Sequence, residues 1–128
     1  MNKICTSIEQ SKRLIELGID VNSADMVYHK ELNGTYTLRV VNNVLEYDIP
    51  AWSLSALLEL MPSYLFEFER GIDLNLYPSI NRKGWLCSYM PNAIENMKTD
   101  KFKQITHADN LVDAAFDMIV WLKENNYL

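Results

Sequence analysis

Proline and glycine are scarce in this chain of 128 residues, which holds 4 of each. That scarcity argues against a collagen-like, low-complexity or linker-rich protein, because such chains are rich in these residues. Cysteine is scarcer still, and Cys5 and Cys87 lie far apart in the sequence. A disulfide framework needs more cysteines, and a structural zinc site needs closely spaced ligand pairs. We therefore expect two reduced thiols, no metal and no cofactor.

Long hydrophobic runs are also missing. The longest, Met118–Leu122, is far shorter than the ~20 apolar residues of a membrane-spanning helix. The first residues contain no apolar stretch typical of a signal peptide. These two features predict a cytoplasmic protein that does not associate with membranes. A net charge of −5 argues against general nucleic-acid binding, because proteins that neutralise phosphates usually carry a basic surplus.

The residues that are present suffice to build a core. Hydrophobic side chains make up 48% of the chain and aromatic ones 11%, which predicts one folded domain over residues 1–128. The pattern favours the α+β class, with an antiparallel sheet packed by an N-terminal, a central and a long C-terminal helix. Helical periodicity and capping signals place these helices at about 7–17, 53–61 and 110–125. The expected N-terminal caps are Thr6 with Glu9, Ser53, and Asn110 with Asp113.

An N-terminal three-stranded meander is expected between residues 27 and 49. Asn33-Gly34 and Asn42-Asn43 are signals for two-residue hairpin loops, and each such loop fixes a register. In that register most apolar side chains share one face, an agreement that a shift of one residue would destroy. The expected pairs are Val27–Val40, His29–Leu38 and Glu31–Tyr36, then Val40–Leu45, Leu38–Tyr47 and Tyr36–Ile49.

Two or three further strands follow the central helix. Residues 64–69 and 72–77 alternate apolar and polar side chains, and residues 85–90 do so more loosely. Residues 91–108 show weak periodicity, and we expect a short helix at about 93–97 with irregular chain around it.

One candidate pocket lies on the predicted meander and consists of His29, Glu31, Tyr47 and Trp52. His29 and Glu31 share a face in the predicted register, so they form a conceivable acid–base couple. A histidine on an apolar face is also typical of a core or rim residue with one hydrogen bond.

The C-terminal helix offers a candidate interface. Apart from a sector with Asp113, Asp117 and Glu124, its circumference is almost entirely apolar, which is wider than the stripe of about 100° that covers one sheet. Such a helix packs against a sheet and a neighbouring helix together, or it exposes a surface for a homo-oligomer or another protein. The residues of the candidate interface are Met118, Trp121 and Leu122.

A local excess of positive charge in residues 81–107 forms a candidate polyanion patch. Its basic residues are Arg82, Lys83, Lys98, Lys101 and Lys103. Aromatic residues stand nearby in the sequence, so contact with a nucleic acid through this patch is one alternative and an ordinary solvated loop is the other.

Two segments resemble known proteins. Residues 6–18 (TSIEQSKRLIELG), together with the tail 108–116 (ADNLVDAAF) and 121–125 (WLKEN), are similar to small uncharacterised bacterial proteins of prophage or mobile-element type. The likeness covers about a third of the chain and rests on helix signatures. It implies a genomic context and transfers no catalytic residue.

The sequence contains no motif for nucleotide binding, zinc-dependent hydrolysis, calcium binding or a serine nucleophile. Together with the wide apolar surface of the last helix, this favours a non-enzymatic interaction or oligomerisation module that binds itself or another protein. The alternatives are a small ligand-binding protein or enzyme at the His29/Glu31 pocket, and a nucleic-acid-associated factor that uses the 82–103 patch.

Overall fold

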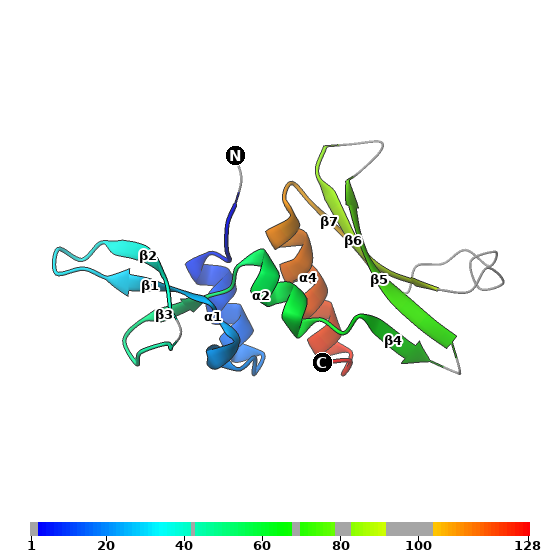
Figure 1. Ribbon diagram of the computed structural model, residues 1–128, viewed down its shortest axis with the longest axis horizontal. Coiled ribbons are helices and arrows are strands. Elements are labelled where there is room, and N and C mark those ends of the chain that lie inside the picture. Colours follow the sequence, from blue (N-terminus) through cyan, green and yellow to red (C-terminus); the bar gives the residue numbers. More distant parts are fainter. Residues whose placement is uncertain (1–2, 42, 68–69, 79–82, 92–103) are drawn as a thin grey trace. The chain divides into compact units, whose positions relative to one another are not determined.

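The computed structural model describes residues 3–41, 43–67, 70–78, 83–91 and 104–128. The chain divides into two compact units, Met1–Leu60 and Met61–Leu128. Each unit combines helix with antiparallel sheet, which confirms the α+β class (Figure 1). The expectation of a single domain over residues 1–128 stays a prediction.

The first unit carries a three-stranded sheet with the order β2-β1-β3. In chain order its elements are α1 (Ile8–Glu16), the 3-10 helix η1 (Val21–Ser23), β1 (Met26–Lys30), β2 (Tyr36–Val40), β3 (Ile49–Ala51) and α2 (Leu54–Leu60). The predicted first and central helices are thus confirmed. Helix α1 packs against β3.

Helix α1 begins one residue later than its predicted cap. The Ser7 hydroxyl accepts a hydrogen bond from the Gln10 amide, and the Gln10 side chain accepts one from the Ser7 amide, which together form a capping box. Thr6 does not cap the helix: its side chain is fully buried, and its hydroxyl forms a hydrogen bond with the Ser11 hydroxyl at 2.8 Å. The prediction of Thr6 and Glu9 as the cap is therefore wrong.

The first hairpin differs from the prediction by one residue. Its loop has three residues rather than two, because the Glu31 amide donates to the Thr35 carbonyl at 2.7 Å and Gly34 takes the left-handed conformation with φ of 88°. This is a type I turn followed by a glycine bulge, a common three-residue hairpin loop. The Asn33 side chain favours it by accepting hydrogen bonds from the Thr35 amide and hydroxyl.

That extra loop residue changes the side-chain partners along the whole hairpin. Tyr28 instead of His29 lies opposite Leu38, and His29 lies opposite Thr37. The predicted apolar face is therefore wrong, because His29 belongs to the face of Thr37.

The predicted meander is also wrong in its strand order. Strand β3 pairs with β1, with Tyr28 opposite Ile49 and Val27 opposite Pro50, so the second predicted hairpin is not formed. Residues between β2 and β3 instead cross to the other side of β1. Asp48 is buried in this connection.

The second unit carries a four-stranded antiparallel sheet with the sequential order β4-β5-β6-β7. Its elements are β4 (Tyr64–Glu67), β5 (Arg70–Pro78), β6 (Trp85–Pro91), β7 (Gln104–Ala108) and helix α4 (Leu111–Glu124). The strands expected near residues 64–69, 72–77 and 85–90 are confirmed. Strand β7 was expected to be irregular chain, and the short helix expected at 93–97 lies outside the described residues.

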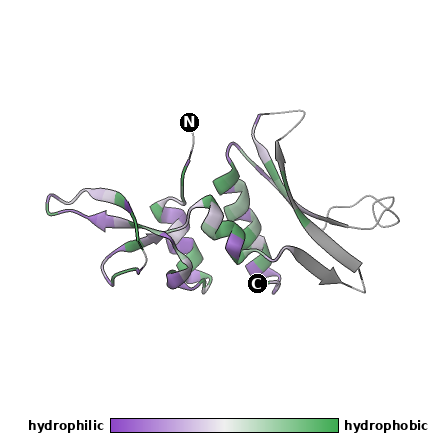
Figure 2. Ribbon diagram, viewed as in Figure 1, coloured by the Kyte–Doolittle hydropathy of each residue, from purple (hydrophilic) through white to green (hydrophobic). Residues whose placement is uncertain are grey.

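Helix α4 packs on β6 and β7 and begins at its predicted cap. The Asn110 side chain accepts a hydrogen bond from the Asp113 amide at 2.8 Å. The Thr106 hydroxyl of β7 donates to the Ala114 carbonyl at 2.7 Å and so ties the sheet to the helix. Figure 2 colours most of α4 as hydrophobic. Its buried residues are Val112, Ala114, Ala115, Met118, Ile119 and Leu122.

No helix in the described part of the chain is long and apolar enough to cross a membrane.

Candidate functional site

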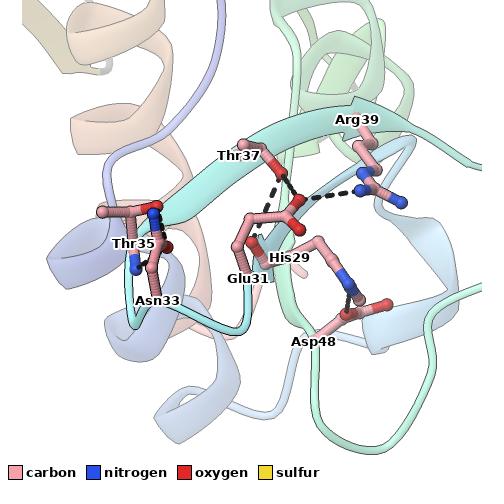
Figure 3. A network of polar contacts seen from close by, with 7 residues as sticks. All are labelled: His29, Glu31, Asn33, Thr35, Thr37, Arg39 and Asp48. Atoms are coloured by element: carbon pink, nitrogen blue, oxygen red, sulfur yellow. Dashed lines mark hydrogen bonds and ion pairs between the residues drawn. The ribbon is translucent and has the colours of Figure 1, made fainter.

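One face of the first sheet carries a cluster of polar side chains (Figure 3). We call it the polar cluster and define it as His29, Glu31, Thr37, Arg39 and Asp48. The first two come from β1 and its end, the next two from β2, and Asp48 from the connection before β3. The three-residue loop brings them together, because it places His29 opposite Thr37 and so puts both on the same face.

The best-defined contact in the polar cluster is between His29 and Asp48. His29 Nδ1 lies 2.9 Å from Asp48 Oδ1, and the side chains are 26% and 4% exposed. An ionised carboxylate only accepts hydrogen bonds, so Nδ1 carries the proton in this pair. The other ring nitrogen, Nε2, forms no hydrogen bond with the residues that the structure describes. The Tyr47 ring lies edge-on to the imidazole at a centroid distance of 6.3 Å.

Glu31 joins the two strands of the hairpin. Its Oε1 accepts hydrogen bonds from the Thr37 hydroxyl and from the Arg39 guanidinium, both at 2.7 Å. These contacts, first Thr37 and then Arg39, hold the pKa of the Glu31 carboxyl below its ordinary value. The pair is open to solvent, so its main effect is to fix the arrangement of side chains on this face.

The polar cluster has the parts of an acid–base pair in His29 and Asp48. A carboxylate that holds the imidazole from one side leaves the lone pair of the other nitrogen available as a hydrogen-bond acceptor. Among the described residues no group of three His, Cys, Asp or Glu side chains is arranged to hold a metal ion.

The candidate pocket of the sequence analysis is brought together only in part. His29, Glu31 and Tyr47 lie on or beside the polar cluster. Trp52 does not, because it is fully buried and its indole N–H donates to the Ser23 hydroxyl at 2.9 Å. Trp52 is therefore a core residue, and its place in the predicted pocket stays a prediction.

Strand β2 presents an open edge to solvent. It is the outer strand of its sheet, and the described residues pair with it only through β1. In an antiparallel ladder, residues alternate between those that bond to the neighbour and those that point away. The bonds from Glu31 to Thr35 and from Val41 to Asp25 fix this alternation, so Thr37 and Arg39 bond to β1.

The backbone groups of Tyr36, Leu38 and Val40 therefore point outward. Their side chains add apolar surface, since Tyr36 is 43% and Val40 is 80% exposed and Leu38 is half-buried. We call these three residues the β2 edge. Backbone groups without a partner among the described residues thus occur on these three residues, two of which also expose apolar side chains.

Of the three residues in the candidate interface on α4, only Trp121 is partly exposed. Met118 and Leu122 are fully buried, so neither side chain is open to solvent in this structure. Trp121 is half-buried and stacks on Tyr127 with ring centroids 5.4 Å apart. The wide apolar circumference of this helix thus serves mainly to fill a core.

The candidate polyanion patch falls mostly outside the described residues, which is where Arg82, Lys98, Lys101 and Lys103 lie. Lys83 is exposed, and its carbonyl accepts a hydrogen bond from His107 Nε2 at 2.9 Å.

The sequence analysis missed Thr37, Arg39 and Asp48, and it also missed the β2 edge. The signal that could have revealed them is the stretch Asn33-Gly34-Thr35, in which the asparagine side chain can bond two residues ahead. Such a bond favours the three-residue loop, and from that loop the observed register follows.

No family model matches the chain, and no curated protein or solved structure shows significant similarity to it.

Proposed function

We propose that this protein is a non-enzymatic interaction module that binds another polypeptide by adding a strand to the β2 edge. The observation that carries the proposal is that Tyr36, Leu38 and Val40 have outward backbone groups, while the apolar side chains of Tyr36 and Val40 are exposed and that of Leu38 is half-buried. An extended chain that adds to a sheet edge gains main-chain hydrogen bonds, and alternate side chains give it specificity.

The polar cluster supports this role from the opposite face of the same sheet. The contacts of Glu31 with Thr37 and Arg39 link β1 to β2 and hold the edge strand in place. An edge that is already ordered before binding loses little conformational entropy when a partner strand is added. A cytoplasmic location belongs to the same proposal, as does a role as a mobile-element accessory factor, which is implied by the resemblance of residues 6–18, 108–116 and 121–125.

Amide hydrogen exchange tests the proposal directly. The probe is an extended peptide of alternating threonine and valine, added in excess to dilute protein. We expect slower exchange at the amides of Tyr36, Leu38 and Val40, because each gains a backbone acceptor. The amides of Thr37 and Arg39 already bond to β1 and serve as internal controls with little change.

A variant of the β2 edge provides a second test. Leu38→Pro removes one outward N–H and leaves the bonds to β1 intact, since proline is tolerated at outward positions of edge strands. It should reduce peptide binding. The proposal is contradicted if neither the peptide nor a rising protein concentration slows exchange at the three outward amides.

A second candidate function rests on the contact between His29 and Asp48. The Nε2 of His29 has no hydrogen bond with the described residues, and in the doubly protonated imidazole its N–H would donate to a small anion. Arg39, which also bonds to Glu31, lies on the same face, so the polar cluster would then be a ligand site. Titration with inorganic phosphate, followed through the imidazole ¹⁵N signals, tests it. His107 is a natural control because its Nε2 already donates to the Lys83 carbonyl. Phosphate should shift His29 and not His107, and equal or absent shifts would rule this candidate out.

A further inference from the structure

The two edges of the first sheet differ in whether they can accept another strand. Strand β3 has three residues, and Pro50 lies at its centre opposite Val27. Because Val27 bonds to β2, Pro50 occupies the position on β3 that faces outward, where it has no N–H to donate. The chain near β3 is further occupied by Thr6, whose amide donates to the Trp52 carbonyl at 2.9 Å.

Strand β2 has none of these features. It has five residues and no proline. Its one charged side chain, Arg39, belongs to a residue whose backbone bonds inward, and its guanidinium is already paired with Glu31. Natural sheets protect their edges with prolines, charges or bulges, and an edge with few of them is a template for another strand. The glycine bulge of the hairpin lies before Tyr36, outside the strand itself. Addition of a strand to this sheet is therefore expected at β2.

We propose that the strand added to the β2 edge is β2 of a second copy of this chain, paired antiparallel about Leu38. This inference rests on the proposed function and names its partner. The arrangement is self-complementary: a two-fold axis through the Leu38 pair places Tyr36 of each copy opposite Val40 of the other. The outward groups of these three residues then bond to one another, and the two three-stranded sheets become one continuous sheet.

The side chains fit this pairing. On one face, each exposed Tyr36 and Val40 gains an apolar partner directly across the new ladder, a type of pair that stabilises sheets. A peptide unrelated to this chain would make the same backbone bonds without these matched side-chain pairs.

Charge complementarity on the other face also favours a second copy. The same register places Arg39 of each copy opposite Thr37 of the other. The Thr37 hydroxyl donates to Glu31 Oε1, and Glu31 Oε2 has no hydrogen bond within the part of the chain that the structure describes. The Arg39 guanidinium of one copy thus lies beside Glu31 Oε2 of the other, which can accept a hydrogen bond from it. Glu31 and Arg39 side chains then alternate across the boundary between the two sheets.

Sedimentation equilibrium of the full chain over a concentration series tests the inference. We expect a monomer–dimer equilibrium. Val40→Lys should lower the association constant by about tenfold or more. It replaces both apolar Tyr36–Val40 pairs between the copies with pairs that contain a charged lysine. Leu38→Pro should weaken it by about as much, because two inter-chain hydrogen bonds are lost.

Leu32→Lys is the matched control. Leu32 is an exposed leucine at the hairpin tip, away from the β2 edge, so its substitution adds the same charge to the same hairpin and should leave association unchanged. Far-UV circular dichroism and tryptophan fluorescence confirm that each variant is folded.

Several outcomes would overturn the inference. A monomer at every concentration does so, as does a dimer that survives both edge variants or is weakened equally by Leu32→Lys. The hydrogen-exchange experiment with the threonine–valine peptide separates the two proposals. If the peptide protects the outward amides while the chain stays monomeric, the proposed function stands and the second copy is wrong.

Discussion

At the scale of single residues, the structure separates side chains that resemble one another in the sequence. The Nδ1 of His29 contacts a buried carboxylate and its Nε2 has no hydrogen bond with the described residues, whereas the Nε2 of His107 donates to the Lys83 carbonyl. Trp52 is enclosed in a core, while Trp121 is half-buried and stacks on Tyr127. The role of each histidine and each tryptophan depends on strand register and packing. Neither of these can be read from the amino-acid composition.

Burial also governs the chemistry of Cys87. Desolvation raises the pKa of its thiol to about 12 from an ordinary value of 9.0. A thiol with a raised pKa contributes stability that is complete below the unfolded pKa and is lost as the pH rises through the folded one. We therefore expect the free energy of unfolding to fall between about pH 9 and pH 12.

Denaturant unfolding at pH 7.5 and at pH 10.5 measures this effect. Cys87→Ala should show a smaller difference between the two pH values than the unaltered chain, because one of the titrating groups is gone. An unchanged difference in the variant would show that Cys87 does not contribute. A reagent such as dithionitrobenzoate should also react slowly with Cys87 in the folded protein, because the thiolate is the reactive form.

At the scale of elements, the sequence locates the helices but does not determine every helix cap or loop conformation. Asn110 caps α4 as the sequence predicts, and α1 and α2 lie within the ranges expected for them. The first hairpin shows the limit, because Asn33-Gly34 fits both a two-residue and a three-residue loop. The choice between them moves every partner by one residue and decides whether His29 faces apolar or polar neighbours.

The pairing of strands that lie far apart in the chain could not be predicted from the sequence for a related reason. Strand β3 is short and contains Pro50, so no periodic pattern marks it as the partner of β1. Strand β7 likewise has only five residues, and it is defined by its pairing with β6 rather than by its own alternation. The polar cluster depends on the first of these pairings, because Asp48 lies in the connection that leads to β3.

Two glycines with positive φ give a paired prediction about turns. At Gly34, φ is 88° and a methyl group would meet open space, so Gly34→Ala carries only the backbone strain of about 1–2 kcal/mol. At Gly84, φ is 112° and the same methyl group would collide with the Ala108 carbonyl oxygen. Gly84→Ala should therefore destabilise the protein clearly more than Gly34→Ala in chemical denaturation. Equal losses would contradict the close approach of Gly84 to β7.

The capping box of α1 gives a third prediction. Ser7→Ala removes the acceptor for the Gln10 amide and should lower the free energy of unfolding by about 1 kcal/mol. Ser7→Asp should retain most of the stability, because aspartate also caps helices well. Thr6→Ala tests the competing assignment: it removes the buried bonds to Ser11 and Trp52 instead of a cap. A loss of helix stability in Thr6→Ala with none in Ser7→Ala would reverse the assignment.

At the scale of the whole molecule, the structure changes where an interface is expected. The sequence favours the last helix because its apolar surface is wide, but Met118 and Leu122 are fully buried. The β2 edge is short and contains only ordinary strand residues, so composition does not mark it. Its open backbone becomes visible only when the strand order β2-β1-β3 is known.

Cross-linking across the proposed two-fold axis tests the central claim most directly. Leu38→Cys places a thiol on that axis in each copy, where Cα atoms of a hydrogen-bonded pair lie about 5.5 Å apart. The native Cys5 and Cys87 are both buried and provide a low background. With a short bismaleimide, Leu38→Cys should give a covalent dimer in high yield, and Leu32→Cys, at the hairpin tip, should give little. Equal yields from the two variants, or none from Leu38→Cys, would contradict strand pairing at the β2 edge.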